Sequence, residues 1–204
     1  MVVLAIILTI TGVVFTNQSS FNKTIVLANT AYDIALSLRS AETYGLGSRV
    51  VGGVVNTGYG MHFDIANPKS FTLFADTFPT PSTSSICHPT TDSAAPDAQS
   101  GNCGYELNQD ALVMNYVVGN GITISDFCAY TSSGWSCAAN GSLHTLDIVF
   151  SRPNPDPFMS ANGAYSGAAP VTAACITVSS PLGGSRFVSV AASGEITANA
   201  ASCP

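Results

Sequence analysis

The residues with the clearest chemistry in this 204-residue chain are its six cysteines, which all lie in the later part of the sequence. An even number of cysteines beyond an apolar N-terminal segment is typical of chains that form disulfides in an oxidising compartment. The sequence does not decide among the possible pairings, and buried thiols are the alternative. We expect three candidate disulfides, which are Cys87–Cys103, Cys128–Cys137 and Cys175–Cys203.

Metal-binding chemistry is not expected from the spacing of the histidines. Zinc sites bring Cys and His ligands together at short, regular spacings, and the chain has no Cys-x-x-Cys pair. His62, His88 and His144 do not fall at such a spacing from the cysteines. A calcium ion held by Asp156 and nearby carbonyl oxygens is the alternative. We predict no metal site and no cofactor.

Catalytic chemistry would need a recognisable constellation of residues, and the sequence contains none of the common ones. The chain lacks a Gly-x-Ser-x-Gly elbow, a P-loop, a His-Glu-x-x-His motif and an EF-hand loop. His62 and Asp64 would share one face of a strand, which more often gives a cross-strand hydrogen bond than an acid–base pair. Asp76, Asp147 and Asp156 are interpreted as surface carboxylates. We therefore predict that the chain is not an enzyme and has no catalytic residues.

The elements that position these residues begin with an uncharged segment of fifteen residues. As a helix it covers about 23 Å, which is less than the roughly 30 Å of a bilayer core. We expect residues 1–15 to be the membrane and assembly half of a long helix. The residues predicted to face lipid or neighbouring helices are Val2, Val3, Leu4, Ile6, Ile7, Leu8, Ile10, Val13, Val14 and Phe15.

Residues 16–46 continue the helix with an amphipathic pattern. Apolar residues recur there at steps of three and four, which builds one stripe along a helix. We expect this stripe to pack on the chain's own globular domain. Its predicted members are Phe21, Ile25, Ala28, Tyr32, Ala35 and Leu38.

Residues 47–204 have the pattern of antiparallel β structure, because β-branched and aromatic residues alternate with polar ones. Asn120-Gly121 favours a type I′ turn and predicts a hairpin between the strands on either side. The stretch 77–110 is rich in Pro, Ser, Thr and Asp and is expected to be a long surface loop. The expected strands are 58–65, 71–76, 112–118, 122–128, 143–150, 174–179 and 186–190, and a turn at 193–196 is expected to lead into a final short strand. The predicted fold class is α+β, with a long N-terminal helical stalk and a mainly antiparallel β-sheet head.

Two parts of the chain resemble type IV pilins and pseudopilins of the FimT/GspH type. Residues 1–14 (MVVLAIILTITGVV) and 31–41 (AYDIALSLRSA) are similar to the first helix of that family. Residues 74–76 (FAD) and 186–194 (RFVSVAASG) are similar to its head. The family has a cleavage-site glycine, an N-terminal phenylalanine and a glutamate at the fifth mature position, and this sequence has none of them. We therefore expect the chain to be clipped ahead of Met1, and about five more residues would give a membrane helix of about 20.

The resemblance implies a structural role. It implies a subunit held by its N-terminal helix in the cytoplasmic membrane, with an extracytoplasmic head, that assembles into a type IV pilus or a type II secretion-like filament at the cell surface. Lipid and a helix bundle are similarly apolar, so the helix exchanges one for the other at little cost. The implied partners are further copies of the chain, the membrane and the pilus or secretion assembly machinery.

The charge of the chain limits its partners. Six Lys and Arg residues stand against twelve Asp and Glu residues, which gives a net charge of −6. A phosphate backbone would be repelled, so nucleic acid is not a favoured partner. The alternatives are a minor pseudopilin for DNA uptake or secretion, and a signal-anchored extracytoplasmic enzyme or binding protein.

Overall fold

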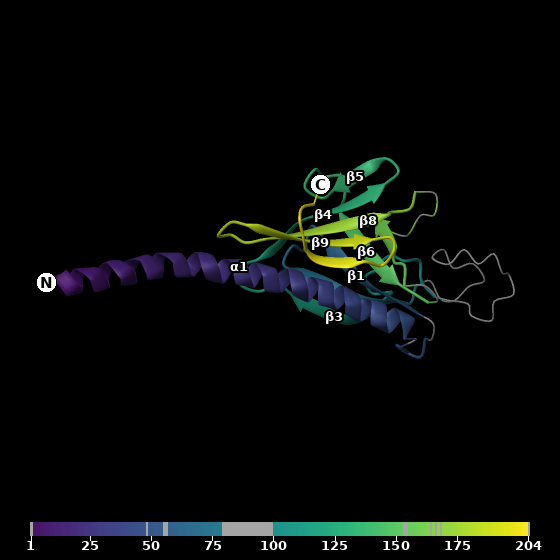
Figure 1. Cartoon of the computed structure of the whole chain (residues 1–204). Helices are drawn as coiled ribbons and strands as arrows, with labels where there is room; N and C mark the ends of the chain where they lie inside the picture. Colours follow the sequence, from purple (N-terminus) through teal and green to yellow (C-terminus); the bar gives the residue numbers. More distant parts are fainter. Residues whose placement is uncertain are drawn as a thin grey trace.

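The computed structural model describes residues 2–47, 49–54, 57–78, 100–152, 155–163, 165, 167 and 169–203, with the side chains of residues 5, 8 and 13–23 left out. Over this part of the chain, one helix, α1 (Val2–Leu46), precedes ten strands. The N-terminal part of α1 extends beyond the sheets, and its C-terminal part lies along them (Figure 1).

The strands form two five-stranded sheets in which all neighbouring strands are antiparallel. The first sheet has the order β3-β2-β1-β6-β7. Its strands are β1 (Gly58–Asp64), β2 (Ser70–Asp76), β3 (Ala111–Val117), β6 (Thr145–Phe150) and β7 (Phe158–Ala161). The second sheet has the order β10-β9-β8-β4-β5. Its strands are β4 (Thr123–Thr131), β5 (Gly134–Cys137), β8 (Ala173–Ser179), β9 (Ser185–Ala191) and β10 (Ile196–Ala200).

The predicted fold class is wrong in its proportions and its architecture. Ten antiparallel strands in two five-stranded sheets make up most of the fold beyond the helix. The protein is therefore not a long helical stalk with a small sheet head, because the two sheets are the bulk of the fold and one side of α1, from Leu27 to Ala41, is part of their core. The sequence led to the stalk prediction because the periodic pattern of the long helix is easier to recognise than the pattern of the short strands that follow it.

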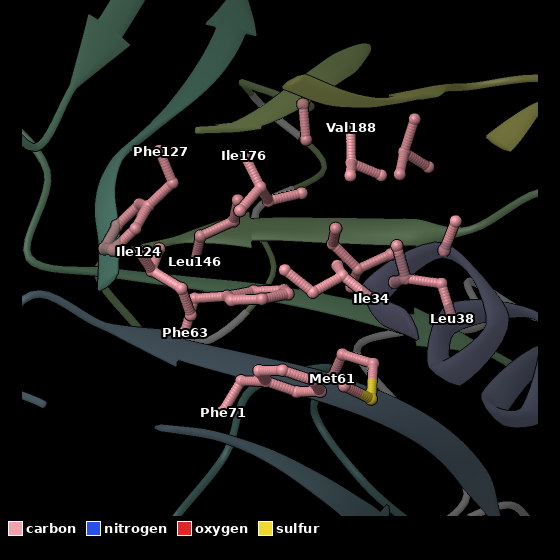
Figure 2. Close-up of a cluster of buried hydrophobic side chains, with 14 of the residues drawn as sticks. Ile34, Leu38, Met61, Phe63, Phe71, Ile124, Phe127, Leu146, Ile176 and Val188 are labelled. Carbon is pink, nitrogen blue, oxygen red and sulfur yellow. The ribbon is translucent and has the colours of Figure 1, made fainter. Parts of the chain in front are cut away.

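The main core lies where α1 meets both sheets (Figure 2). Ile34 and Leu38 of the helix are fully buried beside Met61 of β1 and Val188 of β9. Further apolar side chains from β2, β4, β6 and β8 complete this cluster. The helix therefore joins the two sheets through one hydrophobic core.

The helix buries a stripe that shares Ala35 and Leu38 with the predicted one but differs from it nearer the N-terminus. The buried apolar residues are Leu27, Ala31, Ile34, Ala35, Leu38 and Ala41. Ile25 and Tyr32 of the predicted stripe are exposed by 43% and 58%. Ala28 is half-buried, and the side chain of Phe21 lies outside the described part. The error arose because residues 25–28 are all apolar, so stripes one position apart fit the sequence equally well.

The predicted hairpin at Asn120-Gly121 is also wrong. Both residues have positive φ angles, of 57° and 71°, as the turn requires. However, β3 and β4 on either side belong to different sheets. The turn therefore carries the chain from the first sheet to the second.

Alternation along β1 decides which face of the first sheet carries polar groups. Tyr59, Met61 and Phe63 point into the main core and are fully buried. His62 and Asp64 point to the opposite face, which we call the outer face. The outer face is where the polar side chains described below come together.

Candidate functional site

The N-terminal segment of α1 exposes large apolar side chains. Their exposed fractions run from 52% to 74%, and they are Val2, Val3, Leu4, Ile6, Ile7 and Ile10. Of the other predicted assembly residues, Leu8, Val13, Val14 and Phe15 have side chains outside the described part. No helix in the part of the chain that the structure describes is long and apolar enough to cross a membrane.

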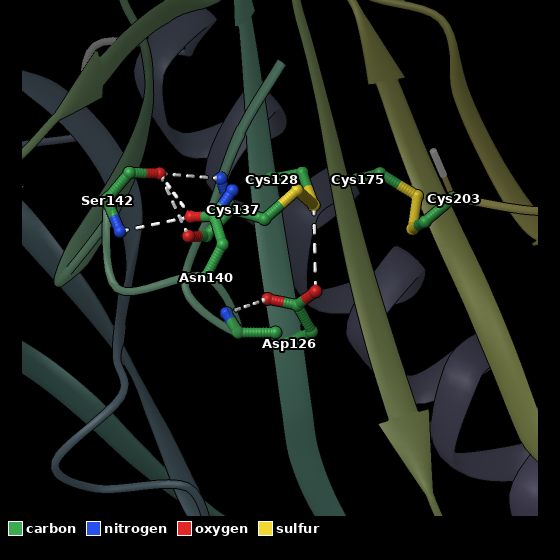
Figure 3. The surroundings of a disulfide bond; sticks show 8 residues. Asp126, Cys128, Cys137, Asn140, Ser142, Cys175 and Cys203 are labelled. Carbon is green, nitrogen blue, oxygen red and sulfur yellow. Dashed lines mark hydrogen bonds between the residues drawn. A yellow bond between two sulfur atoms is a disulfide. The ribbon is translucent and has the colours of Figure 1, made fainter.

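Two disulfides lie in the second sheet (Figure 3). Cys128 of β4 is bonded to Cys137 of β5, its direct cross-strand neighbour. Cys175 of β8 is bonded to Cys203, which ties the C-terminal end to the middle of the sheet. These are two of the predicted pairs. Cys103 is also disulfide-bonded, and Cys87, its predicted partner, lies outside the described residues.

A row of polar side chains crosses the outer face of the first sheet. The strand registers place Asn115 opposite Thr72, Thr72 opposite His62, His62 opposite Asp147, and Asp147 opposite Ser160. Such cross-strand neighbours lie close enough for their side chains to interact. The five strands therefore align five polar residues that are far apart in the sequence.

Residues 100–110 cover part of this outer face. The Ser160 hydroxyl donates a hydrogen bond of 2.6 Å to the backbone oxygen of Cys103. The Tyr105 ring packs on His62 and on Phe74, with ring centroids 4.7 Å and 5.0 Å away. This covering segment takes part of the polar row out of contact with water.

The half-buried His62 and the buried Asp147 form a pair in the row. The Nδ1 atom of His62 lies 2.6 Å from Oδ1 of Asp147, whose side chain is 2% exposed. Burial raises the pKa of the Asp147 carboxyl, whereas hydrogen bonds from His62 and from the Tyr105 backbone oppose the rise. An ionised Asp147 only accepts, so Nδ1–H donates to it. Because Nδ1 is occupied, Nε2 is the ring nitrogen that remains for other chemistry.

Beside this pair the outer face is hollowed into a pocket of about 430 Å³. His62, Asp64 and Asn115 contribute polar groups to its lining, while Tyr105 and Leu112 contribute apolar surface. A histidine held by a buried carboxylate at the wall of a pocket can exchange protons or bind polar groups.

Three carboxylates gather at the far end of β2. Burial raises the pKa of Asp76 well above its usual range, and the charges of Asp110 and Glu106 raise it further. Burial also raises the pKa of Asp110 to about 7, against hydrogen bonds from backbone N–H groups. The three carboxyl groups therefore lie close together in a site that is largely shielded from solvent.

Sequence reasoning found little of this outer face. It placed His62 and Asp64 on one strand face and favoured a cross-strand hydrogen bond there, and the structure forms such a bond between His62 and Asp147, 85 positions away. It treated Asp76 and Asp147 as surface carboxylates, and both are 1% exposed. Asp156, the predicted alternative calcium ligand, is exposed and is outside the cluster of carboxylates at β2. The pairing and register of the strands bring the outer-face residues together, and local sequence patterns do not show which strands will be neighbours.

Comparisons of the chain with protein-family models, with curated proteins and with solved structures gave no match.

Proposed function

We propose that the chain is a structural subunit that assembles into a pilin-like filament through the N-terminal segment of α1. The observation that carries this proposal is the set of six exposed apolar side chains between Val2 and Ile10. In the proposed filament, the same segment of a second copy covers them. Full burial of one such side chain stabilises an assembly by about 1.5–3 kcal/mol. Six exposed side chains of this kind thus provide a strong driving force for packing helix on helix.

Two features of the β-sheet domain support this role. Disulfides form in oxidising compartments, which fits a domain outside the cytoplasm. The N-terminal part of α1 extends beyond the sheets, so helices of neighbouring copies could meet without displacing the domains (Figure 1). In this hypothesis the cytoplasmic membrane holds the segment before assembly, and the machinery of a type IV pilus or type II secretion system draws it into the filament.

Sedimentation and electron microscopy of the full chain after removal of detergent test the proposal. We expect the wild-type chain to form elongated assemblies. The double variant Ile6→Asp/Ile10→Asp should sediment as a monomer, because two charges would have to be buried between helices. Its melting temperature should equal that of the wild type, since neither residue belongs to the core.

The matched control is Val50→Asp, which places the same charge at a 55% exposed apolar residue beyond the other end of α1. This variant should assemble like the wild type. A wild-type chain that remains monomeric, or an Ile6→Asp/Ile10→Asp variant that assembles as well as the wild type, would contradict the proposal.

A further inference from the structure

The pocket on the outer face of the first sheet is built from distant parts of the chain. His62 of β1, Thr72 of β2 and Asn115 of β3 bring three neighbouring strands to its lining. Tyr105 and Leu107 of the covering segment line it as well. Its volume of about 430 Å³ falls within the range of pockets that hold small organic ligands. The pocket is therefore a property of the folded sheet and not of one loop.

His62 is held in one orientation at the wall of this pocket. Its Nδ1 atom is bonded to the buried Asp147, and its own side chain is 15% exposed. The Tyr105 ring packs against the imidazole, with ring centroids 4.7 Å apart. Nε2 is the nitrogen left for a ligand, and little conformational freedom would be lost when a ligand binds to it.

Other polar groups of the lining retain hydrogen-bonding capacity. Oδ1 of Asn115 accepts a long hydrogen bond of 3.5 Å from the Thr72 hydroxyl, and its NH₂ group has no hydrogen-bond partner in the described part of the chain. The oxygens of Asp64 accept from the N–H of Ala66 and the side-chain amide of Asn67, at 2.8 Å and 2.6 Å. Each of these oxygens has a second lone pair. The lining therefore offers both donors and acceptors to a ligand.

The charges of the lining select against anionic ligands. Among the described residues, no Lys or Arg lines the pocket. Asp64 contributes a carboxylate to the lining, and Asp147 is bonded to His62. A phosphate or carboxylate group would be repelled here. Because Asp64 already accepts two hydrogen bonds, an uncharged ligand suits the pocket better than a cation.

Apolar surface lies beside the polar groups. Leu107 and Leu112 line the pocket and are exposed by 70% and 60%. Tyr105 adds an aromatic ring to the same lining. A ligand that covered these side chains would remove apolar area from water, which favours binding. The pocket therefore fits a neutral ligand that has one apolar face and several polar groups.

We propose that this pocket binds a sugar residue, from a free saccharide or from a glycan. Each sugar hydroxyl both donates and accepts hydrogen bonds, which matches the donors and acceptors of Asn115, Asp64 and His62. The C–H face of a sugar ring is apolar and can pack on Tyr105 and the two leucines. Because a ligand of this size makes few contacts, we expect a dissociation constant of about 0.1–1 mM.

A saccharide array and titration calorimetry of the full chain test this site. The chain is kept in a polyoxyethylene detergent, because detergents with sugar headgroups would compete for the pocket. We expect saturable binding of a neutral saccharide at one site per chain. Monosaccharides and longer chains on the same array distinguish recognition of a single sugar residue from recognition of a glycan.

Asn115→Ala should weaken this binding by about fivefold or more, because it removes a hydrogen-bonding group from the lining. Asn115 is exposed, so the substitution should leave the fold intact. Asn29→Ala, the same substitution at an exposed position of α1, should bind like the wild type. The Ile6→Asp/Ile10→Asp variant should also bind like the wild type, since neither residue lines the pocket. Failure of the filament proposal and failure of this one are therefore distinguishable.

Photo-crosslinking locates the bound saccharide without any substitution. The saccharide selected on the array carries a diazirine group, and mass spectrometry identifies the labelled residues. We expect the labels within residues 62–72 and 105–115, which contain the pocket lining.

Spermidine and inorganic phosphate serve as charged probes in the same calorimeter. The proposal fails if no saccharide of the array binds saturably, if Asn115→Ala binds as tightly as the wild type, or if the labels fall outside both segments. Binding of spermidine in the absence of any saccharide binding would overturn it in favour of a site for organic cations.

Discussion

At the scale of single residues, the His62–Asp147 pair shows how burial makes one partner depend on the other. Asp147 is 1% exposed, so its charge has lost the water that would otherwise solvate it. A hydrogen bond from Nδ1 of His62 to Oδ1 of Asp147, at 2.6 Å, replaces part of that solvation. Removal of one partner from a buried pair leaves the other charge uncompensated and costs about 3–5 kcal/mol.

We therefore expect His62→Ala to lower the free energy of unfolding by about 3 kcal/mol at pH 7. The loss should be smaller near pH 4. Burial raises the pKa of Asp147 in the folded chain, and a raised carboxyl pKa favours the folded state at low pH and disfavours it as the pH rises. Urea unfolding at both pH values measures the difference.

The control for this substitution is His144→Ala, since His144 is exposed. Its unfolding free energy should remain within about 0.5 kcal/mol of the wild-type value. An equal loss in the two variants, or a larger loss for His62→Ala at pH 4 than at pH 7, would contradict this account of the pair.

The residues of the outer face could not have been grouped from the sequence. Local spacing placed His62 and Asp64 on one face of a strand but did not identify the cross-strand partner of His62. The true partner depends on β1 pairing with β6, and this pairing is a property of the whole sheet. In the same way, Asp76 and Asp110 are separated by most of a long insertion, so no motif joins them.

At the scale of elements, the existence of the helix and of most strands was predicted better than their arrangement. The expected helix end at residue 46 coincides with the end of α1 (Val2–Leu46), and most expected strands lie within about three residues of the observed ones. Two short strands, β5 and β7, were not predicted because Gly, Ser and Pro near them favour turns. The pairing partners of the strands, and the buried side of the helix, required tertiary contacts that the pattern of one element does not contain.

The end of α1 approaches the first sheet so closely that only glycine fits. A Cβ atom at Gly45 would overlap the backbone oxygen of Phe150 in β6. We expect Gly45→Ala to lower the free energy of unfolding by about 1–3 kcal/mol, even though alanine is the better helix former. Thermal unfolding by circular dichroism provides the measurement.

Gly12→Ala in the same helix is the matched control, because a Cβ atom at Gly12 would meet no atom within 4 Å. It should leave the melting temperature unchanged or raise it slightly, since alanine has the higher helix propensity. If Gly45→Ala were as stable as Gly12→Ala, the close approach of α1 to β6 would be wrong.

At the scale of the whole molecule, the helix makes the two sheets one cooperative unit. Ile34 is fully buried in a core that contains residues of both sheets. The only tryptophan of the chain, Trp135, lies in β5 of the second sheet, at the opposite side of that sheet from β10. Its fluorescence therefore reports on a part of the protein at the edge of the common core.

We expect Ile34→Ala to lower the free energy of unfolding by about 2–5 kcal/mol, as large core truncations do. Tryptophan fluorescence and far-UV circular dichroism should shift together, because both sheets depend on the same helix. Ile25→Ala, at an exposed position of α1, should change stability by less than about 1 kcal/mol. Separate transitions for the two signals would show that the sheets unfold independently.

The disulfides of the second sheet also have a consequence for how the chain matures. Cys128 stands opposite Cys137 on one neighbouring strand and opposite Cys175 on the other. Cross-strand neighbours lie within the reach of a sulfur–sulfur bond. Cys128 could therefore form a disulfide with either Cys137 or Cys175. A Cys128–Cys175 disulfide would leave Cys137 and Cys203 without their native partners and the C-terminal end unattached to β8. Recovery of the native pairs would then require thiol–disulfide exchange.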